Sequence, residues 1–159
     1  MRRSEREMTD PSFMFDVLER TNVLFLSLNT GGAPYVFGVS PFLYQQELYF
    51  HCAGEGRKID LMKRDPRVGF SAAIDIAVEK TTMRYRSVCG TGVLEIVEDA
   101  DLKNKALQAL AKKFRAPCKF PVSEAKFAAT TIMRIRIESM SGKYSRPEEG
   151  PRPVPHYPE

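Results

Sequence analysis

The stretch 48–62 constrains this chain most, because a strand, a glycine-bracketed turn and a helix follow one another within it. An apolar run ends at His51, and glycines bracket the turn at 54–56. The amphipathic segment that follows opens with two cations, Arg57 and Lys58. The first turn of a helix carries a partial positive charge, so cations are disfavoured there. This order of residues therefore indicates an anion close to the start of the predicted helix.

A phosphate group fits that position. The free N–H groups of a first helical turn, a glycine-lined approach and two basic side chains together form a phosphate cradle. The other interpretation is that Arg57 and Lys58 form a solvated helix face, whose charge Glu55 partly neutralises. The segment matches neither the strict P-loop nor the dinucleotide fingerprint.

Composition excludes several classes of function. The chain has 159 residues, of which 43% are hydrophobic and 28% charged, as expected for one globular domain. The net charge is +4, but the cations are scattered and no basic stripe contains aromatic residues. No nucleic-acid partner is therefore expected. The N-terminal segment lacks the apolar region of a signal peptide, and no apolar run is long enough to span a bilayer, so we expect a cytoplasmic protein without a membrane partner.

Cysteine and histidine are too few for a disulfide framework or a familiar metal site. The three cysteines include no C-x-x-C pair, and an odd count favours a reducing compartment. Only two histidines are present, so no metal site is expected. We expect Cys52 and Cys89 to be small residues packed in the core, and Cys118 to lie in a loop.

The pattern along the chain predicts an α+β fold built on a small barrel of about six strands. Strands are expected at 23–28, 34–43, 47–52, 67–78, 84–97 and 131–140, and helices from Asp10-Pro11, at 56–64, from Asp99 to about 114, and at 123–128. Gly90 and Gly92 interrupt one long strand, which indicates either a barrel bend or a ligand against bare backbone. The domain is expected to span 1–143, and a proline-rich tail, 144–159, to lie extended across a surface.

These residues resemble the FMN-binding split-barrel superfamily, which includes pyridoxamine-phosphate oxidase. Within it, the chain looks most like the nitroimidazole-resistance (Nim) flavoproteins. The resemblance runs from about Arg3 to Lys143 and rests on five blocks: GAPYV at 32–36, LYFHCAGEGRK at 48–58, DPRV at 65–68, YRSVCGTG at 85–92 and MSGK at 140–143. The chain departs from the Nim pattern in its compact segment 74–83 and in its tail, so the substrate is the least defined feature.

The resemblance implies a six-stranded split barrel that forms a homodimer, with FMN in a groove between the subunits. Arg57 and Lys58 match the pair that holds the FMN phosphate. The matching positions beside the phosphate, the flavin ring or both are Phe37, Gly38, Val39, Ser40, His51, Cys52, Tyr85, Arg86 and Ser87. His51 is also the catalytic candidate. The alternative for His51 is a hydrogen bond to phosphate or backbone, and for Tyr85 and Arg86 it is ordinary cross-strand pairing. Lys143 either reaches a ligand or lies in solvent.

The resemblance implies an FMN-dependent oxidoreductase that acts on a small molecule, of the pyridoxamine-phosphate oxidase or nitroimidazole reductase type. Two alternatives stay open. One is a non-catalytic module that stores or senses flavin, and the other is a split barrel that uses deazaflavin or heme.

Overall fold

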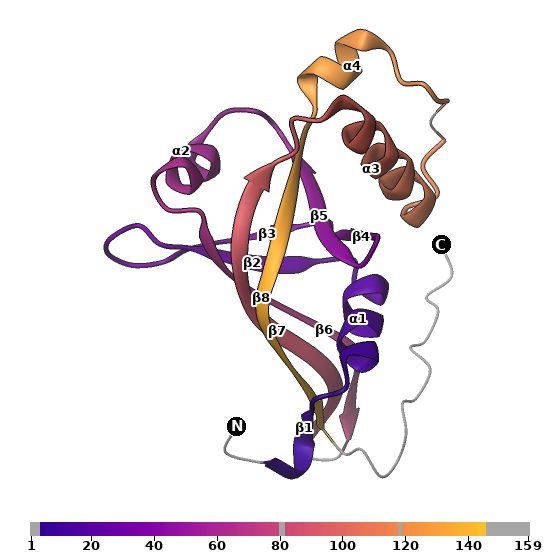
Figure 1. The fold of residues 1–159 in the computed structure, drawn as a ribbon. Coiled ribbons are helices and arrows are strands. Elements are labelled where there is room, and N and C mark those ends of the chain that lie inside the picture. The colour runs from indigo at the N-terminus through magenta and orange to yellow at the C-terminus, as the bar shows by residue number, and fades with distance from the viewer. Residues whose placement is uncertain (1–3, 80–81, 118, 146–159) are drawn as a thin grey trace.

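A strongly curled antiparallel sheet forms the body of the protein, and helices cover its ends and one side (Figure 1). The computed structural model describes residues 4–79, 82–117 and 119–145. The helices are α1 (Pro11–Arg20), α2 (Arg57–Arg64), α3 (Ala100–Lys113) and α4 (Glu124–Ala129), after a single 3₁₀ turn at Ser4–Arg6. The strands are β1 (Glu7–Met8), β2 (Leu24–Leu28), β3 (Tyr35–Val39), β4 (Phe42–Tyr44), β5 (Glu47–Cys52), β6 (Arg67–Glu79), β7 (Thr82–Ile96) and β8 (Thr131–Ser145).

The strands follow the order β3-β2-β6-β7-β8-β5-β4, and β1 pairs with β8 beside this path. The predicted α+β split barrel is confirmed, but the described residues form eight strands where about six were expected. The expected strand 34–43 is two strands, because the chain leaves the ladder at Ser40 and Pro41, and proline has no N–H to donate. The last strand continues to Ser145, beyond the expected end at 140, because it pairs with β7 from Tyr85 to Ile96.

Local sequence signals set the starts of three helices as expected. Asp10 accepts a hydrogen bond from the backbone N–H of Ser12 at 2.9 Å, and Pro11 opens α1. Asp99 caps α3 in the same way through Leu102, and the Ser123 side chain caps α4. Each cap satisfies an N–H group that has no partner within the helix.

Two apolar clusters form the core. The larger one fills the inside of the curled sheet and is closed by α1 and α2. The smaller one lies between α3 and the strands β4, β5 and β8, and contains Phe42, Tyr49 and Ile132. Ala106 and Leu107 anchor α3 there, whereas Phe114 at its C-terminal end is 36% exposed.

Gly90 and Gly92 are required by packing inside the chain. A Cβ at Gly90 would come within 3.0 Å of both the Ser139 carbonyl oxygen and the Phe70 ring. A Cβ at Gly92 would lie 2.5 Å from the Arg136 carbonyl oxygen. The β7–β8 register shifts between Thr91 and Gly92. The structure therefore supports the barrel bend, because protein atoms occupy the space that a ligand would need.

The cysteine predictions have different outcomes. Cys89 was expected in the core, which is wrong: its side chain is exposed and its Sγ lies 3.5 Å from the Ser141 Oγ. Strand alternation directs Val88 inward, and Cys89 therefore points outward. Cys118 and residues 146–159 of the predicted tail lie outside the described residues.

Candidate functional site

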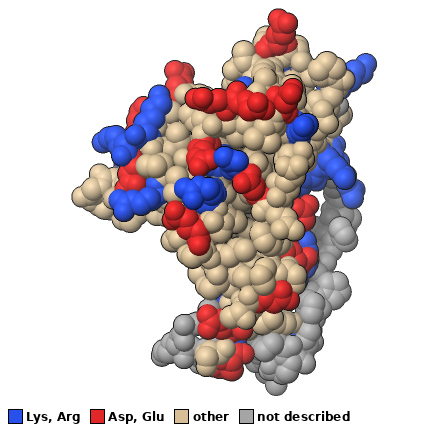
Figure 2. All heavy atoms as spheres, in the orientation of Figure 1, with Lys and Arg blue, Asp and Glu red and all other residues tan. Residues whose placement is uncertain are grey.

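The start of α2 has the geometry expected of an anion site. Gly56 precedes the helix with φ of 105°, a conformation that only glycine adopts readily, and no side chain caps the helix. Arg57 is exposed and Lys58 is half-buried. Several basic side chains lie over α2, with acidic side chains between them (Figure 2). This end of the helix therefore combines uncapped backbone N–H groups with positive charge.

Two aromatic rings of β3 support the basic pair. Tyr35 and Phe37 stack with their centroids 5.3 Å apart. The Arg57 guanidinium carbon lies 4.6 Å from the centroid of the Tyr35 ring, and the Lys58 ammonium lies 5.4 Å from that of Phe37. Such cation–π contacts hold the two side chains against the strand. Tyr35 was not predicted as a site residue, although its position two residues before Phe37 places both on one strand face.

The space behind Lys58 is too small for a ligand. A cavity of about 10 Å³ lies between β3, β5, β8 and α2, and Phe37, Cys52 and Lys58 line it. That volume is at the lower limit for a single water molecule. Any cofactor held by Arg57 and Lys58 must therefore lie on the surface of the chain.

Cys52 fits the predicted structural role. Burial raises the pKa of its thiol above the usual value, and the nearby Lys58 ammonium offsets this only in part. The reactive form of cysteine is the thiolate, and a raised pKa reduces its amount at neutral pH. Cys52 therefore lines the protein interior as a small half-buried side chain.

The predicted site residues divide between the two faces of the sheet. Side chains that face the core are Phe37, Val39, Cys52 and Arg86. Strand alternation directs Gly38, His51, Tyr85 and Ser87 to the outer face, and Ser40, just after the end of β3, is exposed. The outer face is continuous across the sheet, because Gly38 pairs with Phe25, Phe25 with Ser71, and Ser71 with Cys89.

The outer set is itself spread along the sheet. Tyr85 and Ser87 pair with Ser145 and Lys143 at one end of β7, whereas Leu94, near the other end, lines the cavity behind Lys58. His51 is exposed and pairs with Ile132, beside the cluster under α3. Within one chain, the structure therefore does not bring His51, Tyr85 and Ser87 together.

Side chains cover part of the backbone that was expected to lie along a ligand ring. A Cβ at Gly38 would lie 3.3 Å from the Val23 side chain and 3.7 Å from the Phe25 ring. Gly38 therefore leaves room for these two neighbours. Lys143 is half-buried, and its ammonium lies 5.2 Å from the centroid of the Tyr85 ring, so it contacts a predicted site residue.

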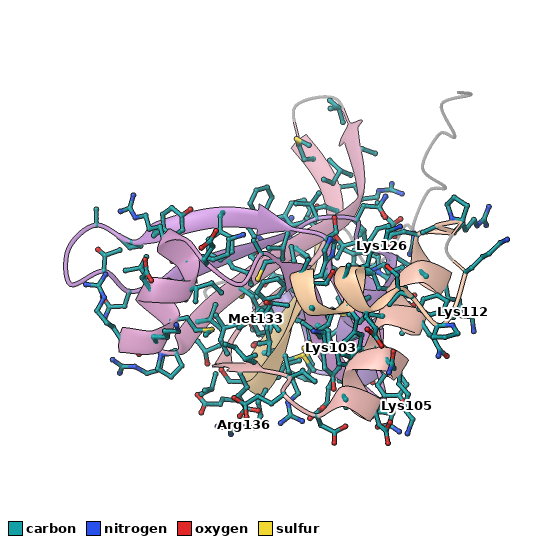
Figure 3. All side chains as sticks on the ribbon, turned by 90° about the horizontal axis from the view of Figure 1, so that it is seen from above. Lys103, Lys105, Lys112, Lys126, Met133 and Arg136 are labelled. Atoms are coloured by element: carbon teal, nitrogen blue, oxygen red, sulfur yellow. The ribbon has the colours of Figure 1, made fainter. Side chains whose placement is uncertain are left out.

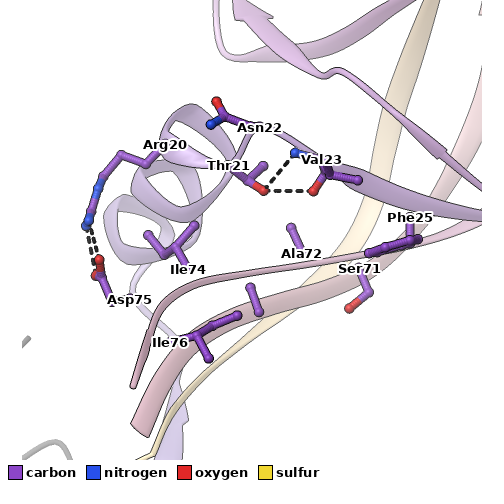
Figure 4. Close-up of a pocket in the computed structure, with 11 residues that line it drawn as sticks. Arg20, Thr21, Asn22, Val23, Phe25, Ser71, Ala72, Ile74, Asp75 and Ile76 are labelled. Carbon is purple, nitrogen blue, oxygen red and sulfur yellow. Dashed lines mark hydrogen bonds and ion pairs between the residues drawn. The ribbon is translucent and has the colours of Figure 1, made fainter. Parts of the chain in front are cut away.

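Arg86 belongs to an ion-pair network between α1, β6 and β7. Its guanidinium contacts Asp16 at 2.6 Å and Asp75 at 3.5 Å, and it lies 4.4 Å from the centroid of the Phe13 ring. Arg20 also forms two hydrogen bonds with Asp75 (Figure 4). Releasing Arg86 to a ligand would leave the buried Asp75 with less compensating charge, which is costly. These contacts favour the structural interpretation of Arg86.

A hollow of about 500 Å³ lies beside this network, between the end of α1 and strands β2 and β6 (Figure 4). Apolar residues dominate its lining, including Val23, Phe25, Ile74 and Ile76. No group of three or more potential metal-binding side chains occurs within 4–79, 82–117 and 119–145. Nor does the described part of the chain contain a helix long and apolar enough to cross a membrane.

The sequence model of the pyridoxamine 5′-phosphate oxidase family matches residues 10–144, which is most of the chain. The chain belongs to this family. The match also places it in the FMN-binding split-barrel superfamily. No curated protein matches the sequence.

Solved structures share the split-barrel fold of the family. A candidate 5-nitroimidazole antibiotic resistance protein from Bacteroides thetaiotaomicron has a TM-score of 0.76 at 22% identity, over 87% of this chain and 86% of that one. The flavocytochrome Anf3 from Azotobacter vinelandii has a TM-score of 0.76 at 16% identity, over 100% and 86%. An FAD and heme binding protein from Mycobacterium smegmatis has a TM-score of 0.77 at 20% identity, over 94% and 77%. At these identities the likeness establishes the fold alone.

Proposed function

We propose that this protein binds FMN and is an oxidoreductase that acts on a small molecule. The observation that carries the proposal is the start of α2. Arg57 and Lys58 are the first two residues of this helix, they follow Gly56, and no side chain caps the helix. A dianionic phosphate would compensate both cations and accept hydrogen bonds from the backbone. Membership of the pyridoxamine 5′-phosphate oxidase family supports FMN as the bearer of that phosphate.

Arg57, Lys58 and His51 can each be given a role that is consistent with its position. Arg57 and Lys58 would bind the phosphate, with Tyr35 and Phe37 holding them in place. Bound FMN would supply hydride chemistry at its ring. His51 is exposed on the outer face, where its imidazole could exchange a proton with a bound substrate. The two free cysteines of the described residues favour a cytoplasmic setting.

A homodimer would unite the separated site residues. Tyr85 and Ser87 lie on the outer face of the sheet, far along β7 from α2, so one chain alone does not surround a cofactor with all of them. The same face exposes 56% of Phe25 and 58% of Val36, next to small residues of β6. A second copy of this chain would cover these apolar side chains and could complete the FMN groove.

Light scattering tests the homodimer. We expect a mass of twice 18.0 kDa for the native protein, and dissociation when Phe25→Glu and Val36→Glu place charges on the outer face. Phe114→Glu adds a charge at an exposed aromatic residue of another surface and should leave the dimer intact. A monomeric native protein would contradict the proposal.

A spectrum and a titration test the cofactor. The purified protein should absorb in the visible range with flavin bands, or the apoprotein should bind added FMN saturably at micromolar concentration or tighter. If neither occurs, FMN is excluded, and deazaflavin and heme are the next cofactors to titrate.

His51→Ala separates catalysis from binding. We expect the variant to bind FMN as the native protein does, because His51 points to the opposite face of β5 from Cys52, away from Lys58 of the proposed phosphate site. Turnover with a reduced nicotinamide donor and a nitroaromatic acceptor should fall by about 10²-fold or more, as is typical when a proton-transfer group is lost. Unchanged rates would assign His51 a structural role. Absence of turnover in the native protein would favour flavin storage or sensing.

A further inference from the structure

A second hollow, of about 620 Å³, lies on the other side of the molecule from α2. It separates α3 from the turn between β4 and β5, and the end of α1 closes it. Its lining residues are Glu19, Leu43, Tyr44, Gln45, Lys105, Gln108, Ala109, Lys112 and Lys113. This volume is in the range of small-molecule pockets. We call it the α3 groove.

The α3 groove is basic. Three lysines and one glutamate line it, so its net charge is positive. Lys105 and Lys112 are seven residues apart, which is about two helical turns, so both project from the same side of α3 (Figure 3). Neither forms an ion pair with any residue that the structure describes, and both are exposed. Their charge is therefore available to a ligand.

Lys113 strengthens the positive field at the inner wall. It is half-buried, and its ammonium donates hydrogen bonds to the carbonyl oxygens of Thr21 at 2.9 Å and Leu18 at 3.4 Å. Burial lowers the pKa of Lys113, and the nearby Glu19 partly restores it. Lys113 is thus held in place by α1, whereas Lys105 and Lys112 are exposed at the rim.

The opposite wall offers amides and an aromatic surface. Gln45 and Gln46 form the β4–β5 turn with φ of 51° and 62°, a left-handed conformation that is unfavourable for non-glycine residues. This turn brings Gln45 to the groove, which Gln108 of α3 also lines. The Tyr44 ring is packed edge-on against Tyr49, with centroids 6.4 Å apart. The groove therefore combines cations and hydrogen-bonding amides with an apolar surface.

We propose that the α3 groove binds a small organic phosphate, with its anionic group between Lys105 and Lys112 and its apolar body against Tyr44 and the neighbouring Leu43 and Ala109. Phosphate compensates the lysines, and the amides of Gln45 and Gln108 hydrogen-bond polar groups of the ligand. This site shares no residue with the start of α2 and does not depend on the function proposed there.

Calorimetric titration of the purified protein with adenosine 5′-diphosphate, with and without excess FMN in the solution, tests the proposal. We expect saturable binding that weakens as salt is added. The Lys105→Gln/Lys112→Gln variant should bind at least about tenfold more weakly, because two charge-assisted contacts are lost. Lys119→Gln/Lys126→Gln removes the same charge from exposed positions outside the groove and should bind within about twofold of the native protein.

Two further outcomes decide whether the nucleotide binds in the α3 groove or at the start of α2. Arg57→Ala/Lys58→Ala should bind adenosine 5′-diphosphate as the native protein does, whereas a matching loss would place the nucleotide at α2 and overturn the proposal. The absence of saturable binding, or equal losses in the Lys105/Lys112 and Lys119/Lys126 variants, would also overturn it.

Discussion

Replacing Arg57 and Lys58 together by alanine is expected to weaken FMN binding by about 10²-fold or more. Hydrogen bonds to charged groups contribute about 1.5–3 kcal/mol each, and two such contacts would be lost. Fluorescence titration of the apoprotein with FMN measures the change. The fold should survive, because Arg57 is exposed and Lys58 contacts only the rim of the core through Phe37 and the small cavity.

The same helix provides a matched control for this variant. Lys63→Ala/Arg64→Ala removes two cations from the last turn of α2 and should leave FMN affinity within about twofold. It should lower helix stability slightly, because cations stabilise the C-terminal end of a helix. Native-like FMN affinity in Arg57→Ala/Lys58→Ala would contradict the phosphate site. If both double variants lost FMN affinity equally, the net positive charge of α2 would explain the binding, and a specific contact of Arg57 and Lys58 would not.

Gly90→Ala is expected to destabilise the fold by about 3 kcal/mol or more. The new methyl group would come within 3.0 Å of the Ser139 carbonyl oxygen and the Phe70 ring. Overpacking of a core typically costs about 1–3 kcal/mol, and here the β8 backbone would have to move away from β7. Urea unfolding followed by circular dichroism measures the loss in free energy of unfolding.

Gly69→Ala is the control for Gly90→Ala. Gly69 also lies in a long strand, but its Cβ would meet only the Ser27 side chain, at 3.8 Å. That is an ordinary van der Waals distance, so stability should change by about 0.5 kcal/mol or less. If Gly90→Ala were as mild as Gly69→Ala, a barrel bend would not explain the glycine. In that case the space beside Gly90 would be open to a ligand.

Features with short-range causes could be predicted from the sequence. The caps at Asp10 and Asp99, the turn before Arg57 and the amphipathic α2 each depend on residues within a few positions of one another. The blocks around the turn also carried the family resemblance, which the match over residues 10–144 confirms. The position of the basic pair at the start of a helix could therefore be predicted from the sequence alone.

Features that depend on distant pairing required the structure. Arg86 finds Asp16 on α1 and Asp75 on β6, and no local pattern links these three residues. Alternation shows that His51 and Cys52 point in opposite directions, but the core under α2 decides which of them faces inward. Cys89 was placed on the wrong side for the same reason.

The sequence by itself determined the family, the α+β class and the cationic start of α2, because these follow from local order and motif. Only the tertiary structure decided how the predicted site residues are shared between the two faces of the sheet. Strand faces are assigned by burial against distant elements, and here α1, α2 and α3 cover different parts of the curled sheet. The same packing formed the α3 groove from the end of α1, the β4–β5 turn and α3, which are not neighbours in the sequence.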